Sequence, residues 1–166
     1  MDFKKAQNYW KEKDASNKNM PSGELKKEID SFSSSHNTLA LATGYGDYVR
    51  CTPVEYTYYK DSYWIMSEGG DKFIGLEKNR NVCIAIFDSY EGFGKIKGMQ
   101  VEGTAEFIEP FSEEYNAFLA LKKIPVEAIK KLPEPMPMIR IVPRETDLLE
   151  SSLKEKGYSS RQHYTY

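Results

Sequence analysis

The chain has 166 residues, with 23 lysines and arginines against 25 aspartates and glutamates, and its formal net charge is -2. This length allows one domain with a hydrophobic core, and the balanced charge argues against nucleic acid or an anionic membrane as partner. We find no apolar stretch typical of a signal peptide near the start, and no run approaching the roughly 18 apolar residues of a membrane span. We therefore expect a cytoplasmic protein.

Cysteine and histidine are scarce. Cys51 and Cys83 lie in apolar strand patterns, which predicts two buried, reduced thiols rather than a disulfide. His36 and His163 are far apart, and no Cys-x-x-Cys or His-x-x-x-His spacing offers a set of metal ligands. We expect no metal site.

Residues 1–36 are predicted to form helices that pack on the main domain, which takes up residues 37–166. The charged segment 3–20 carries Phe3, Tyr9 and Trp10, and it indicates a short helix followed by a polar loop. A second helix is predicted from about residue 23 to 33, capped by Ser22. Its apolar side chains recur at i, i+4 and i+7 and are expected to face the core: Leu25, Ile29 and Phe32.

The remainder is dominated by strand patterns. We predict six strands, over residues 38–43, 48–59, 63–66, 82–87, 95–107 and 138–142. Pro53 implies a bulge or an edge position in the second of them, and polar and apolar residues alternate over residues 100–106. Short helices are predicted over 72–79, after Ser112, and over 126–132. The fold class is thus mainly β with peripheral α, as a six-stranded barrel that closes its own edges.

The corner between the third strand and the next helix reads Ser67-Glu68-Gly69-Gly70-Asp71-Lys72. The two glycines can adopt positive φ, Asp71 is placed to cap the helix, and Lys72 lies in its first turn. Backbone N–H groups and an ammonium favour a phosphate here, although the Asp71 carboxylate would compete for the same donors. A plain strand-to-helix turn would contain the same glycines, so this segment alone does not distinguish a phosphate site from an ordinary turn.

Four motifs follow one another at compatible spacing between Thr38 and Phe107. They are Arg50-Cys51-Thr52-Pro53-Val54-Glu55, then Met66-Ser67 with Lys72, then Leu76-Glu77-Lys78-Asn79 before the buried strand, and Gln100-Val101-Glu102-Gly103. In this order they resemble the pyridoxamine 5′-phosphate oxidase-like family of FMN-binding split barrels. The resemblance implies a six-stranded split β-barrel with FMN at a homodimer interface.

The resemblance also implies which residues bind FMN. They are Arg50, Cys51, Thr52, Pro53, Val54, Met66, Ser67, Lys72 and Gln100. Arg50 can hold phosphate oxygens in a bidentate manner, Lys72 adds charge, and the backbone of residues 51–54 can line the isoalloxazine ring. The alternative for Arg50 is a strand arginine that faces solvent.

Two departures from the family pattern bear on affinity. Asp71 stands where the family has the first member of a basic pair, and the glutamine that contacts the flavin falls on Gly98. Flavin binding is therefore expected to be weaker. The oxidases' Arg-x-x-x-Ser segment and Trp-containing C-terminal motif are absent from the sequence, and Arg161-Gln162-His163 echoes only an Arg-x-His substrate contact. Oxidation of pyridoxamine phosphate is thus not the leading interpretation.

The leading hypothesis is an FMN-dependent oxidoreductase that reduces a small molecule stacked over the flavin. Because the flavin carries the chemistry, no catalytic side chain is identified. Tyr90 and Phe93, in a glycine-flanked loop, are candidates for the substrate side, with ordinary rim or dimer packing as the alternative. The sequence lacks a dinucleotide fingerprint, so NADH or NADPH would bind only transiently.

Two other functions stay open. Some split barrels bind haem through a histidine, and His36 or His163 can serve as the ligand. The third is a non-catalytic, stress-associated flavin-binding module, which would hold FMN tightly without turnover of NADH or NADPH.

Overall fold

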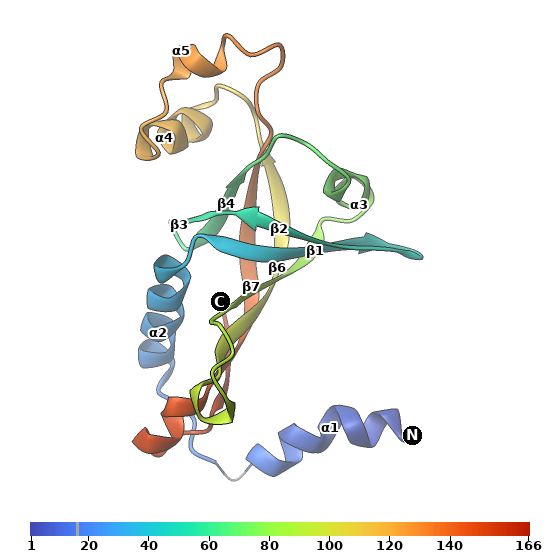
Figure 1. Cartoon of the computed structure of the whole chain (residues 1–166), viewed down its shortest axis with the longest axis vertical. Helices are drawn as coiled ribbons and strands as arrows, with labels where there is room; N and C mark the ends of the chain where they lie inside the picture. The colour runs from blue at the N-terminus through green and yellow to red at the C-terminus, as the bar shows by residue number, and fades with distance from the viewer. Residues whose placement is uncertain (16) are drawn as a thin grey trace.

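One antiparallel sheet of eight strands forms the centre of the computed structural model, which describes residues 1–15 and 17–166 apart from the side chains of Trp10, Lys11 and Asp14. The strands are β1 (Thr38–Tyr45), β2 (Tyr48–Glu55), β3 (Thr57–Tyr59), β4 (Ser62–Met66), β5 (Asn81–Phe87), β6 (Lys97–Ile108), β7 (Met138–Glu150) and β8 (Arg161–Thr165). Their order is β2-β1-β5-β6-β7-β4-β3, and β8 pairs with β7. The sheet curls, so that β1 and β2 cross the direction of β6 and β7 (Figure 1).

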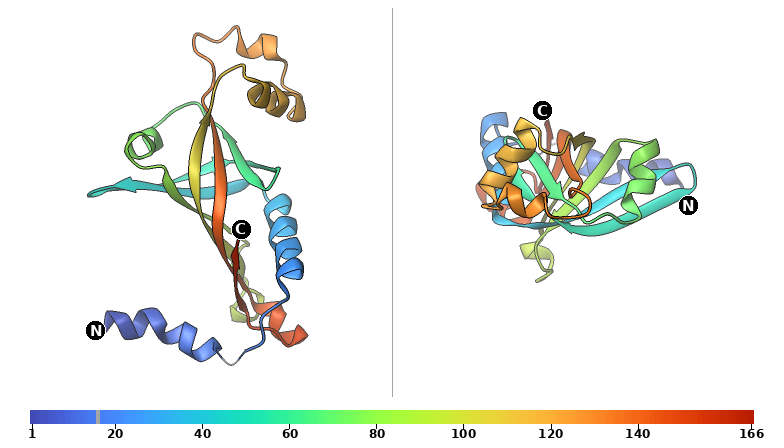
Figure 2. Two further views of the ribbon diagram at one scale, coloured as in Figure 1. Left: turned by 180° about the vertical axis from the view of Figure 1, so that it is seen from behind. Right: turned by 90° about the horizontal axis from the view of Figure 1, so that it is seen from above.

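Helices lie around this sheet, at its sides and ends. They are α1 (Phe3–Asp14), α2 (Ser22–Ser35), α3 (Lys72–Lys78), α4 (Glu113–Leu121) and α5 (Val126–Ile129), with 3-10 turns η1 (Phe93–Lys95) and η2 (Ser151–Lys156). Figure 2 shows α4 and α5 at one end of the long axis and α1 at the other. A mainly β fold with peripheral helices is therefore confirmed. Within the described residues, no helix is both long and apolar enough to cross a membrane.

The prediction of six strands is wrong in number, for two reasons. The predicted strand over residues 48–59 breaks at Tyr56, whose amide donates to the Asn37 carbonyl (2.8 Å) and whose hydroxyl donates to the Ser33 carbonyl (2.7 Å). The C-terminal tail also adds β8, and β7 runs on to Glu150 to pair with it. β2 ends the strand order, so the edge position implied by Pro53 is confirmed.

The N-terminal helices agree with the sequence only in part. Leu25, Ile29 and Phe32 of α2 are buried in the barrel core as predicted. Ser22 is the first residue of α2 rather than its cap, because Pro21 takes the cap position without a side-chain hydrogen bond. The predicted role of Trp10 lies outside the described side chains.

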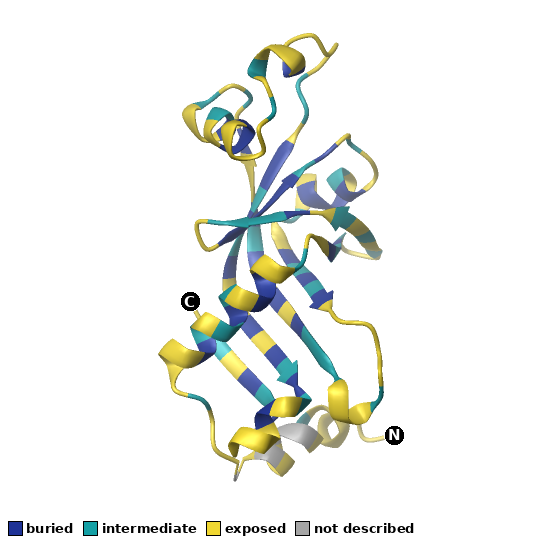
Figure 3. Ribbon diagram, turned by 60° about the vertical axis from the view of Figure 1, so that its left-hand side comes forward, coloured by how far each residue is buried: buried dark blue, intermediate teal, exposed yellow. Residues whose placement is uncertain are grey.

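The described residues form two hydrophobic clusters. The larger one fills the barrel, and buried positions alternate with exposed ones along its strands (Figure 3). The smaller one holds α4 and α5 on the end of the sheet, where the Trp64 and Phe118 rings stack with centroids 5.3 Å apart. The second cluster explains how a helical excursion of about thirty residues between β6 and β7 stays attached to the sheet.

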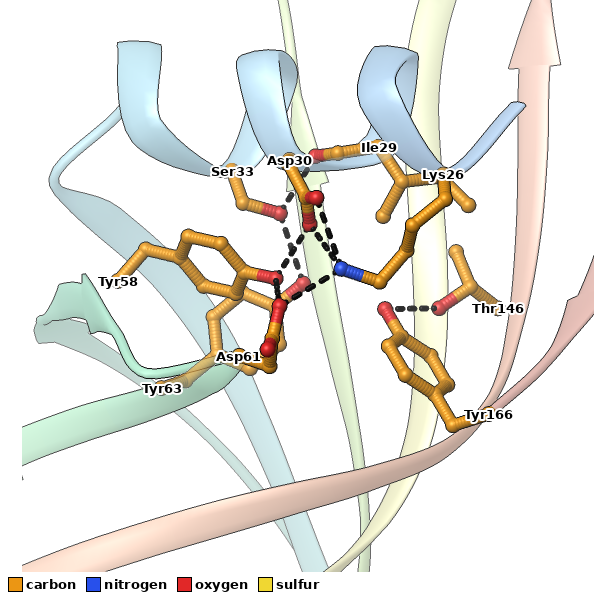
Figure 4. Close-up of polar contacts among 9 residues, drawn as sticks. All are labelled: Lys26, Ile29, Asp30, Ser33, Tyr58, Asp61, Tyr63, Thr146 and Tyr166. Atoms are coloured by element: carbon orange, nitrogen blue, oxygen red, sulfur yellow. Dashed lines mark hydrogen bonds and ion pairs between the residues drawn. The ribbon is translucent and has the colours of Figure 1, made fainter. Parts of the chain in front are cut away.

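A polar network closes the barrel on the side of α2 (Figure 4). The Lys26 ammonium lies 2.6 Å from Asp30 Oδ1 and 2.7 Å from Asp61 Oδ1, and the Tyr58 hydroxyl donates to Asp30. Burial opposes the charge of Lys26, but the hydrogen bonds that its ammonium donates to both carboxylates raise its pKa. The network connects α2 to the turn between β3 and β4. It thereby holds β3, the edge strand that follows Tyr56, in place.

Candidate functional site

The corner between β4 and α3 is a tight loop whose polar groups form hydrogen bonds with one another. Gly69 (φ 107°) and Gly70 (φ 99°) occupy a region of backbone conformation that other residues rarely adopt. The Ser67 hydroxyl donates to the Gly69 carbonyl (3.2 Å) and accepts from the Gly69 amide (3.1 Å). Because α3 has only seven residues, any phosphate bound here would depend on side-chain cations rather than on a helix dipole.

Lys72 places a cation inside this corner. The residue is only 6% exposed, and its ammonium donates to the Gly69 carbonyl. Burial, and then the neighbouring charge of Arg50, lower the pKa of Lys72. Two cations from separate elements, β2 and α3, therefore lie close enough to repel each other, which is the arrangement that an anionic ligand relieves.

Asp71 already contributes one anion to this pair. Its Oδ2 lies 3.0 Å from Arg50 Nη1, and the side chains of Arg50 and Asp71 are 44% and 60% exposed. Asp71 occupies the N-cap position of α3 as predicted, but its side chain makes no capping hydrogen bond and pairs with Arg50 instead. Arg50 is thus not a free arginine that faces solvent. It is also not a phosphate ligand without a competing anion.

Two buried hydroxyls near Arg50 have no hydrogen-bond partner within the described residues, namely those of Thr43 and Thr52. Thr43 lies directly opposite Arg50 in the pairing of β1 with β2, and Thr52 follows Arg50 on the same face of β2. A buried hydroxyl without a partner is energetically costly, and a ligand that reached it could supply the missing hydrogen bond. The cations and hydroxyls fit a phosphate-bearing ligand, and the Asp71 carboxylate is the one group that opposes it.

The other residues predicted for β2 alternate between its two faces. Val54 packs against the barrel core, whereas Cys51 and Pro53 are exposed on the opposite side. That side is continuous across the strands and is called the outer face here. Its side chains include Ala40, Ala42, Cys51, Cys83, Ala85 and Gln100.

The prediction of two buried thiols is wrong for Cys51 and holds in part for Cys83. Cys51 is exposed on the edge strand and Cys83 is half-buried, and both are free. Burial raises the pKa of the Cys83 thiol, and the charge of Glu102 adds to this effect. Cys83 therefore lacks the lowered pKa of a reactive cysteine.

A groove of about 1400 Å³ lies over the outer face of β5 to β8. Gln100 and Tyr90 both line it, so the structure brings these two predicted residues together. His163 also lines it, with Nδ1 2.8 Å from Asp147 Oδ1. This histidine–carboxylate pair was not found from the sequence, because it depends on the register between β7 and β8.

Other candidates are not brought to the corner within one chain. Phe93 is 85% exposed in η1, which lies toward the end of the long axis opposite to α4 and α5, whereas α3 lies beside β1 and β2 (Figure 1). Tyr90 belongs to the same loop and contacts the Phe93 ring edge to face at 6.1 Å. Met66 packs in the smaller hydrophobic cluster. A ligand at the corner would meet Tyr90 or Phe93 only from another chain.

Asn79, the residue that ends the short helix motif, has a structural role. Its side-chain amide donates to the Gly44 carbonyl (2.9 Å), and its oxygen accepts from the Asn81 amide (3.0 Å). It thus joins the end of α3 to both β1 and β5. Asn79 positions the corner without lying in it.

Comparison with known proteins agrees with this architecture. ChuZ of Campylobacter jejuni has a TM-score of 0.64 at 17% identity, over 99% of this chain and 69% of that chain. HutZ of Vibrio cholerae, a haem storage protein, has a TM-score of 0.60 at 19% identity, over 72% and 90%. A FAD-binding protein of Mesorhizobium loti has a TM-score of 0.59 at 16% identity, over 73% and 89%. At these identities the likeness concerns the fold alone.

Sequence comparison identifies the family. None of the curated proteins is similar enough in sequence to count as a match. The sequence model of pyridoxamine 5′-phosphate oxidase, however, matches residues 25–149, which is most of the chain. The resemblance seen in the motifs is confirmed, and the chain belongs to the pyridoxamine 5′-phosphate oxidase family of split barrels.

Proposed function

We propose that this protein binds FMN with the phosphate at Arg50 and Lys72, and that it acts as a flavin-dependent oxidoreductase on a small molecule. The observation that carries the proposal is the meeting of two cations from separate elements beside the unpartnered hydroxyls of Thr43 and Thr52. Flavin, when bound, supplies hydride and electron transfer. The chain's own part is to hold the phosphate and to orient the ring.

The remaining ligand contacts are assigned from the family pattern. The backbone of Cys51, Thr52, Pro53 and Val54 would line the ring, with Ser67 and Met66 beside the phosphate arm. Gln100 would contact the flavin from the groove that it shares with Tyr90, and Tyr90 would lie on the substrate side. NADH or NADPH would bind only transiently, over the ring, as the electron donor. The site would operate in the cytoplasm, where its free thiols stay reduced.

A homodimer is part of this proposal. The outer face carries small side chains on two neighbouring strands, β1 and β5, at Ala40, Ala42 and Ala85, and ends on exposed Val49 and Phe87 (84% and 65%). A second copy laid on this face would bury that apolar area and bring its loop with Phe93 toward the first copy. Because Arg50 lies on the other face of the edge strand β2, a flavin held at Arg50 would reach this interface over the edge of β2, with walls from both chains.

Haem is the second candidate ligand, and one observation favours His163 over His36. The Asp147 carboxylate can only accept, so His163 donates from Nδ1 and keeps a lone pair on Nε2, whose nearest recorded partner is Thr165 Oγ1 at 3.4 Å. Both nitrogens of His36 have oxygen partners, Asp88 Oδ1 (2.9 Å) and the Phe32 carbonyl (3.0 Å). A carboxylate behind the ring is also the usual support for a metal-ligating histidine.

The visible absorption spectrum of the purified protein tests these ligands. We expect flavin bands that survive desalting after addition of FMN, and turnover of NADH or NADPH by the loaded protein. Bound FMN without turnover would leave the stress-associated flavin-binding module as the function. A Soret band that is lost in His163→Ala, and kept in His36→Ala, would identify haem instead. A protein with neither absorption would contradict the proposal.

A further inference from the structure

The corner carries an anion of its own in contact with the cation that would hold phosphate. Asp71 Oδ2 lies 3.0 Å from Arg50 Nη1, within the range of a charge-assisted hydrogen bond. The guanidinium group binds carboxylate and phosphate with the same planar fork. Asp71 therefore occupies a donor edge of Arg50 on which a phosphate oxygen would be held.

The loop places Asp71 there from two sides. The Tyr48 hydroxyl donates to the Asp71 backbone carbonyl at 2.8 Å, and Tyr48 and Arg50 project from the same face of β2. Gly69 and Gly70, both at positive φ, turn the chain back over β2 just before Asp71. The contact with Arg50 is thus set by the backbone and not only by a flexible side chain.

Two other polar side chains of the corner also have their hydrogen-bond partner within the loop itself. The Lys72 ammonium and the Ser67 hydroxyl both donate to the Gly69 carbonyl. A phosphate that entered would have to compete with Asp71 for Arg50 and with Gly69 for Lys72. Of these two competitors only Asp71 is charged, so only Asp71 would repel the incoming dianion.

We infer that Asp71 is a specificity-determining residue that screens Arg50 from phosphate, so that this corner favours FMN over riboflavin less than the same corner would without that carboxylate. The inference rests on the proposed flavin site. A phosphorylated ligand binds when it displaces Asp71 from Arg50, and a ligand without phosphate leaves the pair intact. The exposure of both partners makes this displacement inexpensive, because exposed ion pairs contribute little to stability.

Asp71→Asn tests the inference, because it keeps the shape of the side chain and removes its charge. Dissociation constants for FMN and riboflavin are measured by quenching of flavin fluorescence. We expect FMN to bind about tenfold more tightly than to the unaltered protein, and riboflavin to change by less than about twofold. Glu68→Gln is the matched control, since Glu68 is an exposed carboxylate of the same loop. Its effect on the ratio of the two constants should be small.

An equal ratio of FMN to riboflavin affinity in the unaltered protein and in Asp71→Asn would overturn the inference. If no flavin binds to either, the proposed function is wrong, and inorganic phosphate decides the role of Asp71. The midpoint of thermal unfolding is then compared in phosphate and in chloride of equal ionic strength. A larger shift by phosphate in Asp71→Asn than in the unaltered protein supports the inference, and equal shifts overturn it.

Discussion

Lys72 holds its charge where both burial and Arg50 oppose it. Replacing it by methionine keeps an apolar chain beside the Phe73 ring, 5.2 Å from the ammonium, and removes the charge. If the ammonium binds phosphate, Lys72→Met should weaken FMN binding by about 1.5 to 3 kcal/mol and leave riboflavin binding nearly unchanged. Fluorescence titration of both flavins measures this. Equal losses for the two flavins would show that the corner does not hold the phosphate.

The lowered pKa of Lys72 also predicts a pH dependence with a definite sign. Without bound ligand, the Lys72 ammonium loses its proton at a pH below the ordinary lysine pKa of 10.5. FMN affinity should therefore fall as the pH rises through the lowered pKa. The ratio of FMN to riboflavin affinity isolates this effect, because ionisation of the flavin ring is common to both ligands. In Lys72→Met, the ratio of FMN to riboflavin affinity should no longer change with pH in this range. The same shift makes the folded protein gain stability with rising pH in this window, since the unfolded chain binds the proton more tightly.

Asn79 acts on the scale of secondary-structure elements, where it joins α3 to β1 and β5. Asn79→Ala removes these two hydrogen bonds and a third from the Asn81 side chain, and it should lower the free energy of unfolding by about 1 to 2 kcal/mol, measured by urea denaturation. Asn79→Asp keeps the acceptor for the Asn81 amide and loses the donor to Gly44, so a smaller loss is expected. An alanine variant as stable as the unaltered protein would show that this bridge does not hold α3 in place.

The outer face belongs to the scale of the whole molecule, because a homodimer would bury it. Ala42 lies opposite Cys51 on one side and Cys83 on the other, at the centre of that face. An arginine there would place an unpaired charge in the interface. Sedimentation velocity should therefore show a dimer for the unaltered protein and a monomer for Ala42→Arg.

Ala117→Arg serves as the control for this prediction, since Ala117 is exposed on α4, away from the outer face. It should remain dimeric. Circular dichroism shows whether each variant is folded. A monomeric unaltered protein at micromolar concentration, or a dimeric Ala42→Arg, would contradict a flavin site shared between two copies.

Much of the fold could be predicted from local patterns. The alternation of polar and apolar residues over 100–106 predicts a strand with one buried face. In the structure, Val101 and Ala105 are buried, whereas Gln100 and Glu102 are exposed. The stripe of Leu25, Ile29 and Phe32 reports a helix on the core in the same way. These patterns depend only on residues within a few positions of each other, which is why the sequence by itself determined the fold class and the order of the motifs.

Only the tertiary structure decided which groups meet. Asp71 was expected to cap its own helix, yet it pairs with Arg50 from a strand twenty-one positions earlier. His163 pairs with Asp147 through the register between β7 and β8, and the Phe93 carbonyl accepts a hydrogen bond from Ser151 of η2. Ion pairs and strand register are set by elements distant in sequence, whose relative placement follows from packing the whole core. For this reason the sequence indicated the cations of the site and a carboxylate that competes with a ligand for them, and the fold alone showed that this carboxylate pairs with Arg50.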